Sequence, residues 1–252
     1  LMTISHNHGA QKYSKFKSLI RSIFKKDVIK YSDLKFACSD EVGNEFYSKG
    51  NFIKINNGID VEKYKFYEDI RQKTRKELDL SHKYVLINVG SLSDIKNQKF
   101  LIGLMPDLLE KNPDIRLVLV GDGPKKSELK DLSKDLSVKD QVIFLGNSDR
   151  VNELLMGADI FLFPSIREGL GIAAIEAQAS GLVTLLSTNV PRDTGLTSSA
   201  RFIDLDREKW IDQIINNKLD RQDNIDQIRS KGYDISASAS ELSRIYKNLS
   251  KK

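Results

Sequence analysis

The chain has 252 residues, of which 40% are apolar and 30% are charged, and its formal net charge is +5. This composition is typical of a folded globular protein and excludes a disordered chain. No apolar run reaches the roughly 18 residues that a membrane span needs, and the single cysteine, Cys38, excludes an internal disulfide.

The first 50 residues contain a helical pattern with basic surroundings. Between residues 12 and 31 apolar side chains recur every three or four positions, and lysines and an arginine flank them. Two interpretations stay open: the helix contacts an anionic membrane peripherally, or it packs its apolar face on the rest of the N-terminal part. The apolar positions are Tyr13, Phe16, Ile20, Phe24, Val28 and Tyr31.

From residue 84 onward, short apolar runs alternate with amphipathic stretches. This alternation predicts an α/β fold, a Rossmann-like doubly wound parallel sheet with helices on both faces. Ligands of such sheets bind at the carboxyl ends of the strands, so the loops that follow the strands are expected to converge on one cleft. The predicted strands are 84–89, 116–120, 142–145, 160–163 and 182–186; the helices are 97–110, 125–136, 149–156, 171–180 and 235–250; the loops are 90–96, 121–124, 146–149 and 164–171.

Two glutamates, Glu168 and Glu176, lie eight positions apart around a glycine-rich turn. Glycines let the backbone approach a ligand closely, and the start of the following helix offers N–H groups and a positive dipole end to a diphosphate. Carboxylates beside an anion site make sense when they accept hydrogen bonds from sugar hydroxyls. The alternative is that both glutamates are solvent-exposed surface residues.

Several blocks occur in an order that resembles family 4 glycosyltransferases, which are retaining enzymes with the two-domain GT-B fold. The resemblance implies a place in bacterial capsule or exopolysaccharide biosynthesis. The blocks are Ala37-Cys38-Ser39, Asn57-Gly58-Ile59-Asp60, Val89-Gly90 to Lys96-Asn97-Gln98, Val120 to Pro124, Phe144-Leu145-Gly146, Ala158 to Phe161, Phe163 to Ser165, Glu168 to Gly171 and Glu176 to Leu182.

The resemblance also implies roles for single residues. Lys96 would contact the donor diphosphate, Glu168 the hydroxyls of the donor sugar, and Glu176 the ribose hydroxyls. Lys96 and Glu168 are the predicted catalytic residues. The predicted donor-binding residues are Gly90, Ser91, Lys96, Phe144, Gly146, Glu168, Gly169, Leu170, Gly171 and Glu176, with the base near Phe144 to Gly146 and the phosphates at the N–H groups of Leu170 and Gly171. The UDP-sugar is a substrate, and neither a cofactor nor a metal is expected.

Two departures from the family pattern weaken the expectation of activity. The family has an arginine where this chain has Ser91, and Arg150 and Arg167 are candidates to replace that cation. The match begins inside the family's first domain, near His6-Asn7-His8, which predicts an N-terminally truncated chain. The expected parts are a remnant of the acceptor-side domain (1–56), a nucleotide-sugar-binding domain (57–232) and a helix that crosses back (233–252).

Three functions follow as hypotheses. The first is transfer of a sugar from a UDP-sugar to a glycan or lipid-linked acceptor, in the cytoplasm or at the inner face of the membrane. The second is a non-catalytic donor-binding subunit or an inactive remnant, paired with a partner subunit that supplies the missing domain. The third, a nucleic-acid-binding protein, is motivated by the pI of about 9.0. We expect no nucleic acid, because the basic stretch lacks interleaved stacking aromatics.

Overall fold

The computed structural model describes residues 3–7, 25, 27–47, 50–217 and 221–249. The chain divides into two compact units. Unit 1 comprises Leu1–Ile59, Glu168–Leu170 and Gly232–Lys252, and unit 2 comprises Asp60–Arg167 and Gly171–Lys231. Unit 2 therefore interrupts unit 1 in the sequence.

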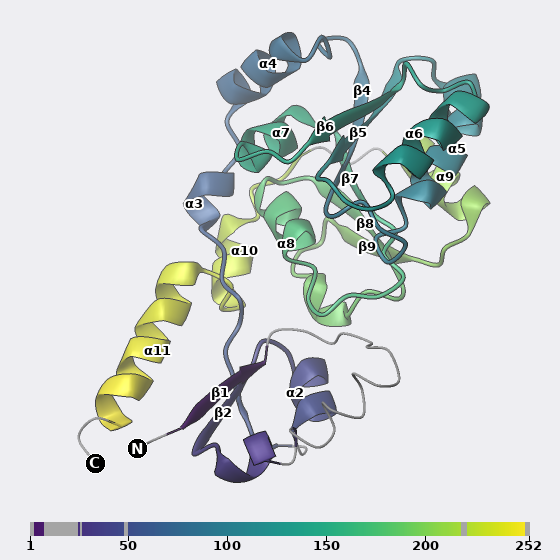
Figure 1. Cartoon of the computed structure of the whole chain (residues 1–252). Helices are drawn as coiled ribbons and strands as arrows, with labels where there is room; N and C mark the ends of the chain where they lie inside the picture. The colour runs from purple at the N-terminus through teal and green to yellow at the C-terminus, as the bar shows by residue number, and fades with distance from the viewer. Residues whose placement is uncertain (1–2, 8–24, 26, 48–49, 218–220, 250–252) are drawn as a thin grey trace. The chain divides into compact units, whose positions relative to one another are not determined.

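Unit 2 is built on a parallel sheet of six strands in the order β6-β5-β4-β7-β8-β9 (Figure 1). Neighbours pair in parallel along the whole sheet, and the order reverses between β4 and β7. This arrangement confirms the predicted doubly wound α/β fold. The strands are β4 (Tyr84–Val89), β5 (Ile115–Val120), β6 (Val142–Gly146), β7 (Ile160–Phe163), β8 (Val183–Ser187) and β9 (Ala200–Ile203).

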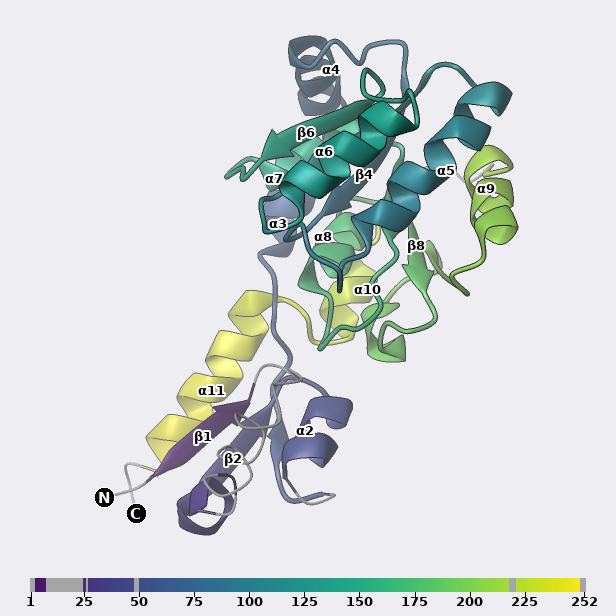
Figure 2. The same ribbon diagram turned by 45° about the vertical axis from the view of Figure 1, so that its right-hand side comes forward.

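Helices cover both faces of this sheet (Figures 1 and 2). On one face α5 (Gln98–Lys111) packs against α6 (Lys126–Asp135) and α9 (Arg207–Ile215). The other face carries α4 (Glu68–Glu77), α7 (Val151–Gly157) and α8 (Ile172–Ala179). Short helices complete the unit: α3 (Val61–Tyr64), η1 (Arg192–Thr194) and α10 (Ile225–Ser230).

The core of unit 2 lies between the sheet and the layer of α5, α6 and α9. Strand residues such as Leu86 and Leu185 are fully buried there together with Trp210 of α9. The Trp210 ring meets Phe100 edge to face at 5.4 Å between centroids, and its indole N–H donates to the Asp204 carbonyl at 2.8 Å. Burying a side chain of this size contributes about 2 kcal/mol, so Trp210 helps to hold α9 against the sheet.

Unit 1 contains a parallel sheet of three short strands in the order β1-β2-β3. The strands are β1 (Ile4–Asn7), β2 (Leu34–Ala37) and β3 (Ile53–Lys54), and the helices are α2 (Asp40–Phe46) and α11 (Ile235–Leu249). Its small core includes Cys38, Val42 and Tyr47. Ser39 caps α2, because its hydroxyl accepts from the Val42 N–H at 3.2 Å.

A backbone clip joins two distant segments of unit 1. Ile59 and Asp234 form a parallel β-bridge, in which the Ile59 N–H donates to Tyr233 and the Ile235 N–H donates to Ile59, both at 2.9 Å. Gly58 permits this approach, since a Cβ at its position would lie 2.6 Å from the Ile235 Cα. The clip holds the start of α11 beside the segment that leads into unit 2.

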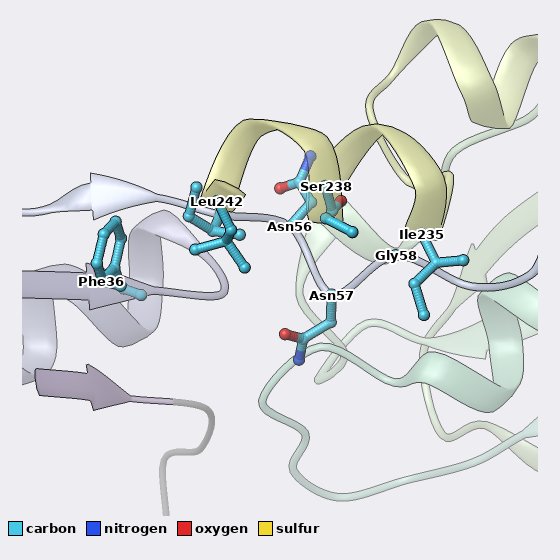
Figure 3. Close-up of a pocket in the computed structure, with 10 residues that line it drawn as sticks. Phe36, Asn56, Asn57, Gly58, Ile235, Ser238 and Leu242 are labelled. Carbon is cyan, nitrogen blue, oxygen red and sulfur yellow. The ribbon is translucent and has the colours of Figure 1, made fainter. Parts of the chain in front are cut away.

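A cavity of about 400 Å³ opens in unit 1 along α11 (Figure 3). Ile235, Ser238 and Leu242 of α11 line one side, and Phe36 and the segment 55–58 line the other. None of the predicted donor-binding residues contributes to this cavity.

Most of the basic segment 12–31, together with His8, lies outside the described residues. Residues 27–31 are helical, and Val28 and Tyr31 are 37% and 63% exposed. In the described part of the chain no helix combines the length and the hydropathy of a membrane span. Membrane contact by this segment stays a prediction.

Candidate functional site

The loops after β4, β5, β6 and β7 meet at the carboxyl edge of the sheet in unit 2. Backbone hydrogen bonds join them: the Gly121 N–H donates to Gly146 at 2.7 Å, and the Leu92 N–H donates to Asp122 at 3.0 Å. The Ile166 N–H in turn donates to Ile95 at 2.8 Å. The loops therefore form one hydrogen-bonded group.

Two glycines make the contact between the first two loops possible. Gly121 has φ +129°, and a Cβ at its position would lie 2.2 Å from the Gly90 carbonyl oxygen. A Cβ at Gly123 would lie 2.4 Å from the carbonyl oxygen of Leu92. Both clashes involve backbone atoms, which cannot rotate away, so these positions require glycine.

We expect Gly121→Ala to lower the free energy of unfolding by about 2 to 4 kcal/mol, because it adds both backbone strain and a clash. Urea unfolding measures this change. Gly103→Ala is the matched control: Gly103 lies inside α5, and its added Cβ would meet nothing closer than 3.9 Å. The control should be neutral or slightly stabilising. Equal destabilisation by both substitutions would contradict the close approach at Gly121.

Lys96 lies in the loop between β4 and α5 and is half-buried. Its Nζ lies 4.9 Å from the centre of the Phe163 ring, at the end of β7. A Cβ at Gly90 would lie 3.4 Å from the Lys96 Cε, so the side chain runs closely past this glycine. The ammonium group is thereby held where the loops meet.

A buried amide network fixes the loop that contains Ser91. The Gln98 Nε2 donates to the Asn88 Oδ1 and to the Ser91 carbonyl, both at 3.1 Å. The Asn88 Nδ2 donates to the Leu162 carbonyl at 2.8 Å and so ties β4 to β7. No role was predicted for Asn88 or Gln98 from the sequence. A polar residue inside the apolar run 84–89 was the signal that could have found Asn88.

Glu176 lies on α8 and is half-buried. Its Oε1 accepts a hydrogen bond from the Tyr64 hydroxyl at 2.6 Å. Burial raises the pKa of the Glu176 carboxyl, while the Tyr64 hydrogen bond and the charge of Lys63 act in the opposite direction. Burial and this carboxylate also raise the pKa of Tyr64. Tyr64 was not predicted from the sequence, because 112 positions separate it from Glu176 and no spacing rule links them.

Gly171 precedes the first turn of α8 in the left-handed conformation, with φ +75°. A Cβ at Gly171 would lie 3.0 Å from the Phe163 ring, so a larger residue would disturb the turn. Among the described residues, no side-chain hydrogen bond caps this helix start. Backbone N–H groups at such a start carry partial positive charge and suit an anion.

The structure places the other predicted residues as follows. Phe144 is the middle residue of β6, and Gly146, with φ +73°, is its last residue. The Lys130 ammonium lies 5.8 Å from the Phe144 ring centre. Ser91 is exposed. Glu168, Gly169 and Leu170 belong to unit 1, and their roles stay a prediction.

Arg150 and Arg167, the candidates to replace the missing cation, have different surroundings in the structure. Arg150 pairs with Glu77 at 2.8 Å and with Glu153 at 2.6 Å. Both are exposed surface pairs, and the role of Arg150 toward a phosphate stays a prediction. Arg167 is half-buried in the loop that precedes Glu168.

No group of three or more His, Cys, Asp or Glu side chains in the described residues has the arrangement of a metal site. The expectation that the reaction needs no metal stays a prediction.

Comparison with known proteins identifies the segment that forms the centre of unit 2. Residues 69–192, just under half of the chain, match the profile of the family described as glycosyl transferases group 1. The match includes Lys96, the glycine turns and Glu176.

Two relatives align over parts of the chain. EpsF of Bacillus subtilis, a glycosyltransferase by its name, is 29% identical over 182 residues, which are 69% of this chain and 47% of EpsF. The UDP-Gal:alpha-D-GlcNAc-diphosphoundecaprenol alpha-1,3-galactosyltransferase of Escherichia coli is 34% identical over 139 residues, 53% of this chain and 35% of that enzyme. The chain thus spans less than half the length of these relatives.

The crystal structure of Alr3699/HepE from Anabaena in complex with UDP superposes with a TM-score of 0.85 at 19% identity. The superposition covers 98% of this chain and 72% of that chain. At this identity the likeness concerns the fold alone, and it shows the fold of GT-B glycosyltransferases.

Proposed function

We propose, from the match of residues 69–192 to glycosyl transferases group 1, that the chain carries the donor-binding half of a retaining glycosyltransferase. The donor is a UDP-sugar, and the acceptor is a glycan or a lipid-linked glycan in cell-surface polysaccharide assembly. The UDP bound to the similar fold and the diphosphoundecaprenol substrate in the name of the E. coli relative support these choices.

One observation carries the proposal: Lys96, the tight glycine turns and the start of α8 lie together at the carboxyl edge of the unit 2 sheet. This edge is where ligands of doubly wound sheets bind. A cation beside N–H groups of a helix start suits a diphosphate without requiring a metal.

In the proposed reaction the bond between the anomeric carbon and the diphosphate oxygen breaks, and the electron pair leaves with UDP. The acceptor hydroxyl oxygen bonds to the anomeric carbon on the same face, and its proton passes to an oxygen of the departing diphosphate. Lys96 stabilises the charge that develops on the leaving diphosphate. Glu168 holds the sugar hydroxyls, Glu176 holds the ribose hydroxyls, and the backbone of Phe144 to Gly146 meets the base.

We expect Glu176→Ala to weaken UDP binding by roughly 10- to 100-fold, since charged hydrogen bonds to two ribose hydroxyls are lost. Calorimetric titration of the chain with UDP measures this change in affinity. The control ligand is 2′,3′-dideoxy-UDP, which lacks the two ribose hydroxyls. The variant and the wild type should bind the dideoxy analogue equally. Glu110→Gln, an exposed glutamate of α5, serves as the control. A folded wild-type chain that binds neither UDP nor any UDP-sugar would refute the proposal.

A second candidate is a non-catalytic donor-binding subunit that acts with a partner subunit. Ser91 favours it, because a serine supplies no charge where the resembling family has an arginine. Both candidates bind UDP-sugars, but only the first releases UDP when acceptor is added. Measuring UDP release with a panel of glycan and lipid-linked acceptors separates them.

A further inference from the structure

Tyr64 and Glu176 meet across two helices of unit 2. Tyr64 is the last residue of α3, which packs against α7 and α8 and is capped by Asp60, whose side chain accepts from the Lys63 N–H at 3.3 Å. The Tyr64 side chain is buried at 8% exposure, and its hydroxyl donates to the Glu176 Oε1 at 2.6 Å. The hydroxyl is therefore held by packing before any ligand binds.

We propose that Tyr64 is a positioning residue for the ribose of the donor nucleotide, acting through the Glu176 carboxylate. This inference rests on the proposed function, in which Glu176 accepts hydrogen bonds from the ribose hydroxyls. The Tyr64 hydroxyl donates its hydrogen bond to the Glu176 Oε1. Oε2 accepts no hydrogen bond from the described residues, which leaves it available to accept from a ligand hydroxyl.

The contact restricts a flexible side chain. A glutamate has three rotatable bonds, and fixing them upon binding a ligand opposes the binding by lost conformational entropy. A hydrogen bond at 2.6 Å between a phenol and a carboxylate is short and charge-assisted, so it selects one orientation of the carboxyl group in advance. Ligand binding then costs less conformational entropy at the Glu176 side chain.

The charged residues near Glu176 form no hydrogen bond with its carboxylate, so the Tyr64 hydroxyl is its main specific contact among the described residues. On the elements that pack against α8 the charged side chains include Glu62 and Lys63 of α3 and Arg192 and Asp193 of η1. Glu62 pairs with Arg229, and Arg192 stacks 4.3 Å from the Phe202 ring centre. Lys63 is the charge that favours the ionised form of Glu176.

A pH dependence follows from the direction of the pKa shift. Burial raises the pKa of Glu176, and the Tyr64 hydrogen bond lowers it. Removing that hydrogen bond raises the pKa further. Because the ribose hydroxyls bind the ionised carboxylate best, UDP affinity falls as the pH drops through this pKa. The midpoint of that fall should lie at a higher pH in Tyr64→Phe than in the wild type.

The experiment is a calorimetric titration of the wild-type chain, Tyr64→Phe and Tyr67→Phe with UDP and 2′,3′-dideoxy-UDP, from acidic to neutral pH. Tyr67 is 45% exposed at the start of α4 and provides the matched control. We expect Tyr64→Phe to bind UDP roughly 3- to 10-fold more weakly at neutral pH. Its midpoint should move to higher pH, with binding of the dideoxy analogue unchanged and Tyr67→Phe indistinguishable from the wild type.

Three outcomes would overturn the inference, and they differ from one another. If Tyr64→Phe shows the wild-type affinity and midpoint while Glu176→Ala weakens binding, Tyr64 does not position the carboxylate. Equal weakening of UDP and dideoxy-UDP binding in Tyr64→Phe would indicate general damage to the fold and also reject the inference. A wild-type chain that does not bind UDP would overturn the proposed function and this inference with it.

Discussion

Replacing Lys96 by alanine is expected to lower kcat/KM for sugar transfer by about 100- to 1,000-fold, the usual effect of removing one group that stabilises developing negative charge. The Lys96 ammonium is held 4.9 Å from the Phe163 ring centre and runs past Gly90, among the turns proposed to cradle the diphosphate. With Ser91 next to Gly90, the loop supplies no arginine to compensate. UDP release from a UDP-sugar, followed with the acceptor panel, measures the loss.

A binding experiment separates the diphosphate role of Lys96 from general damage. Lys96→Ala should weaken UDP binding but leave uridine binding unchanged, because uridine has no diphosphate. Lys139→Ala removes an exposed lysine and should affect neither ligand. If Lys96→Ala retained the wild-type kcat/KM and UDP affinity, Lys96 would be a solvated loop residue, and another cation would have to serve the diphosphate.

The second large effect is expected at Asp159, which lies on the opposite edge of the sheet, just before β7. Its carboxylate pairs with Arg71 at 2.5 Å and Arg75 at 3.2 Å, and it accepts from the Val85 N–H at 2.7 Å. Arg221 lies nearby, stacked on Phe66 and donating to backbone carbonyls at the ends of α7 and α8. One carboxylate thus partners the buried Arg75 and the half-buried Arg71, with Arg221 beside them.

Asp159→Asn should therefore lower the free energy of unfolding by about 3 kcal/mol, since the buried Arg75 and the half-buried Arg71 lose their counter-charge. Urea unfolding followed by circular dichroism measures it. Asp131→Asn is the control: it removes an exposed partner of Lys134 and should leave the unfolding midpoint unchanged. If Asp159→Asn unfolded at the same urea concentration as the wild type, the backbone carbonyls at the helix ends would be sufficient partners for the arginines.

The sequence predicted the sheet of unit 2 well for a physical reason. Strands buried on both faces are continuous apolar runs, and their ends are marked by polar or glycine residues. The predicted strands 84–89 and 160–163 coincide with β4 and β7. The edge strand β9 was missed, since its residues, with Arg201 among them, are only partly buried and lack this pattern.

Contacts between distant segments could not be predicted. Neither the Tyr64 hydrogen bond to Glu176 nor the pairing of Arg71 and Arg75 with Asp159 follows from local spacing, because the partners are brought together by the topology. The same limit applied to Arg150, whose ion pair with Glu77 joins residues 73 positions apart.

The clip between Ile59 and Asp234 bears on the order in which the chain folds. In the unfolded chain, closing the loop between these residues costs conformational entropy that grows with the number of intervening residues. Once unit 2 has folded, the chain between these residues is no longer a flexible loop. Closing the bridge then loses much less conformational entropy. Unit 1 should therefore acquire its C-terminal helix after unit 2 has folded.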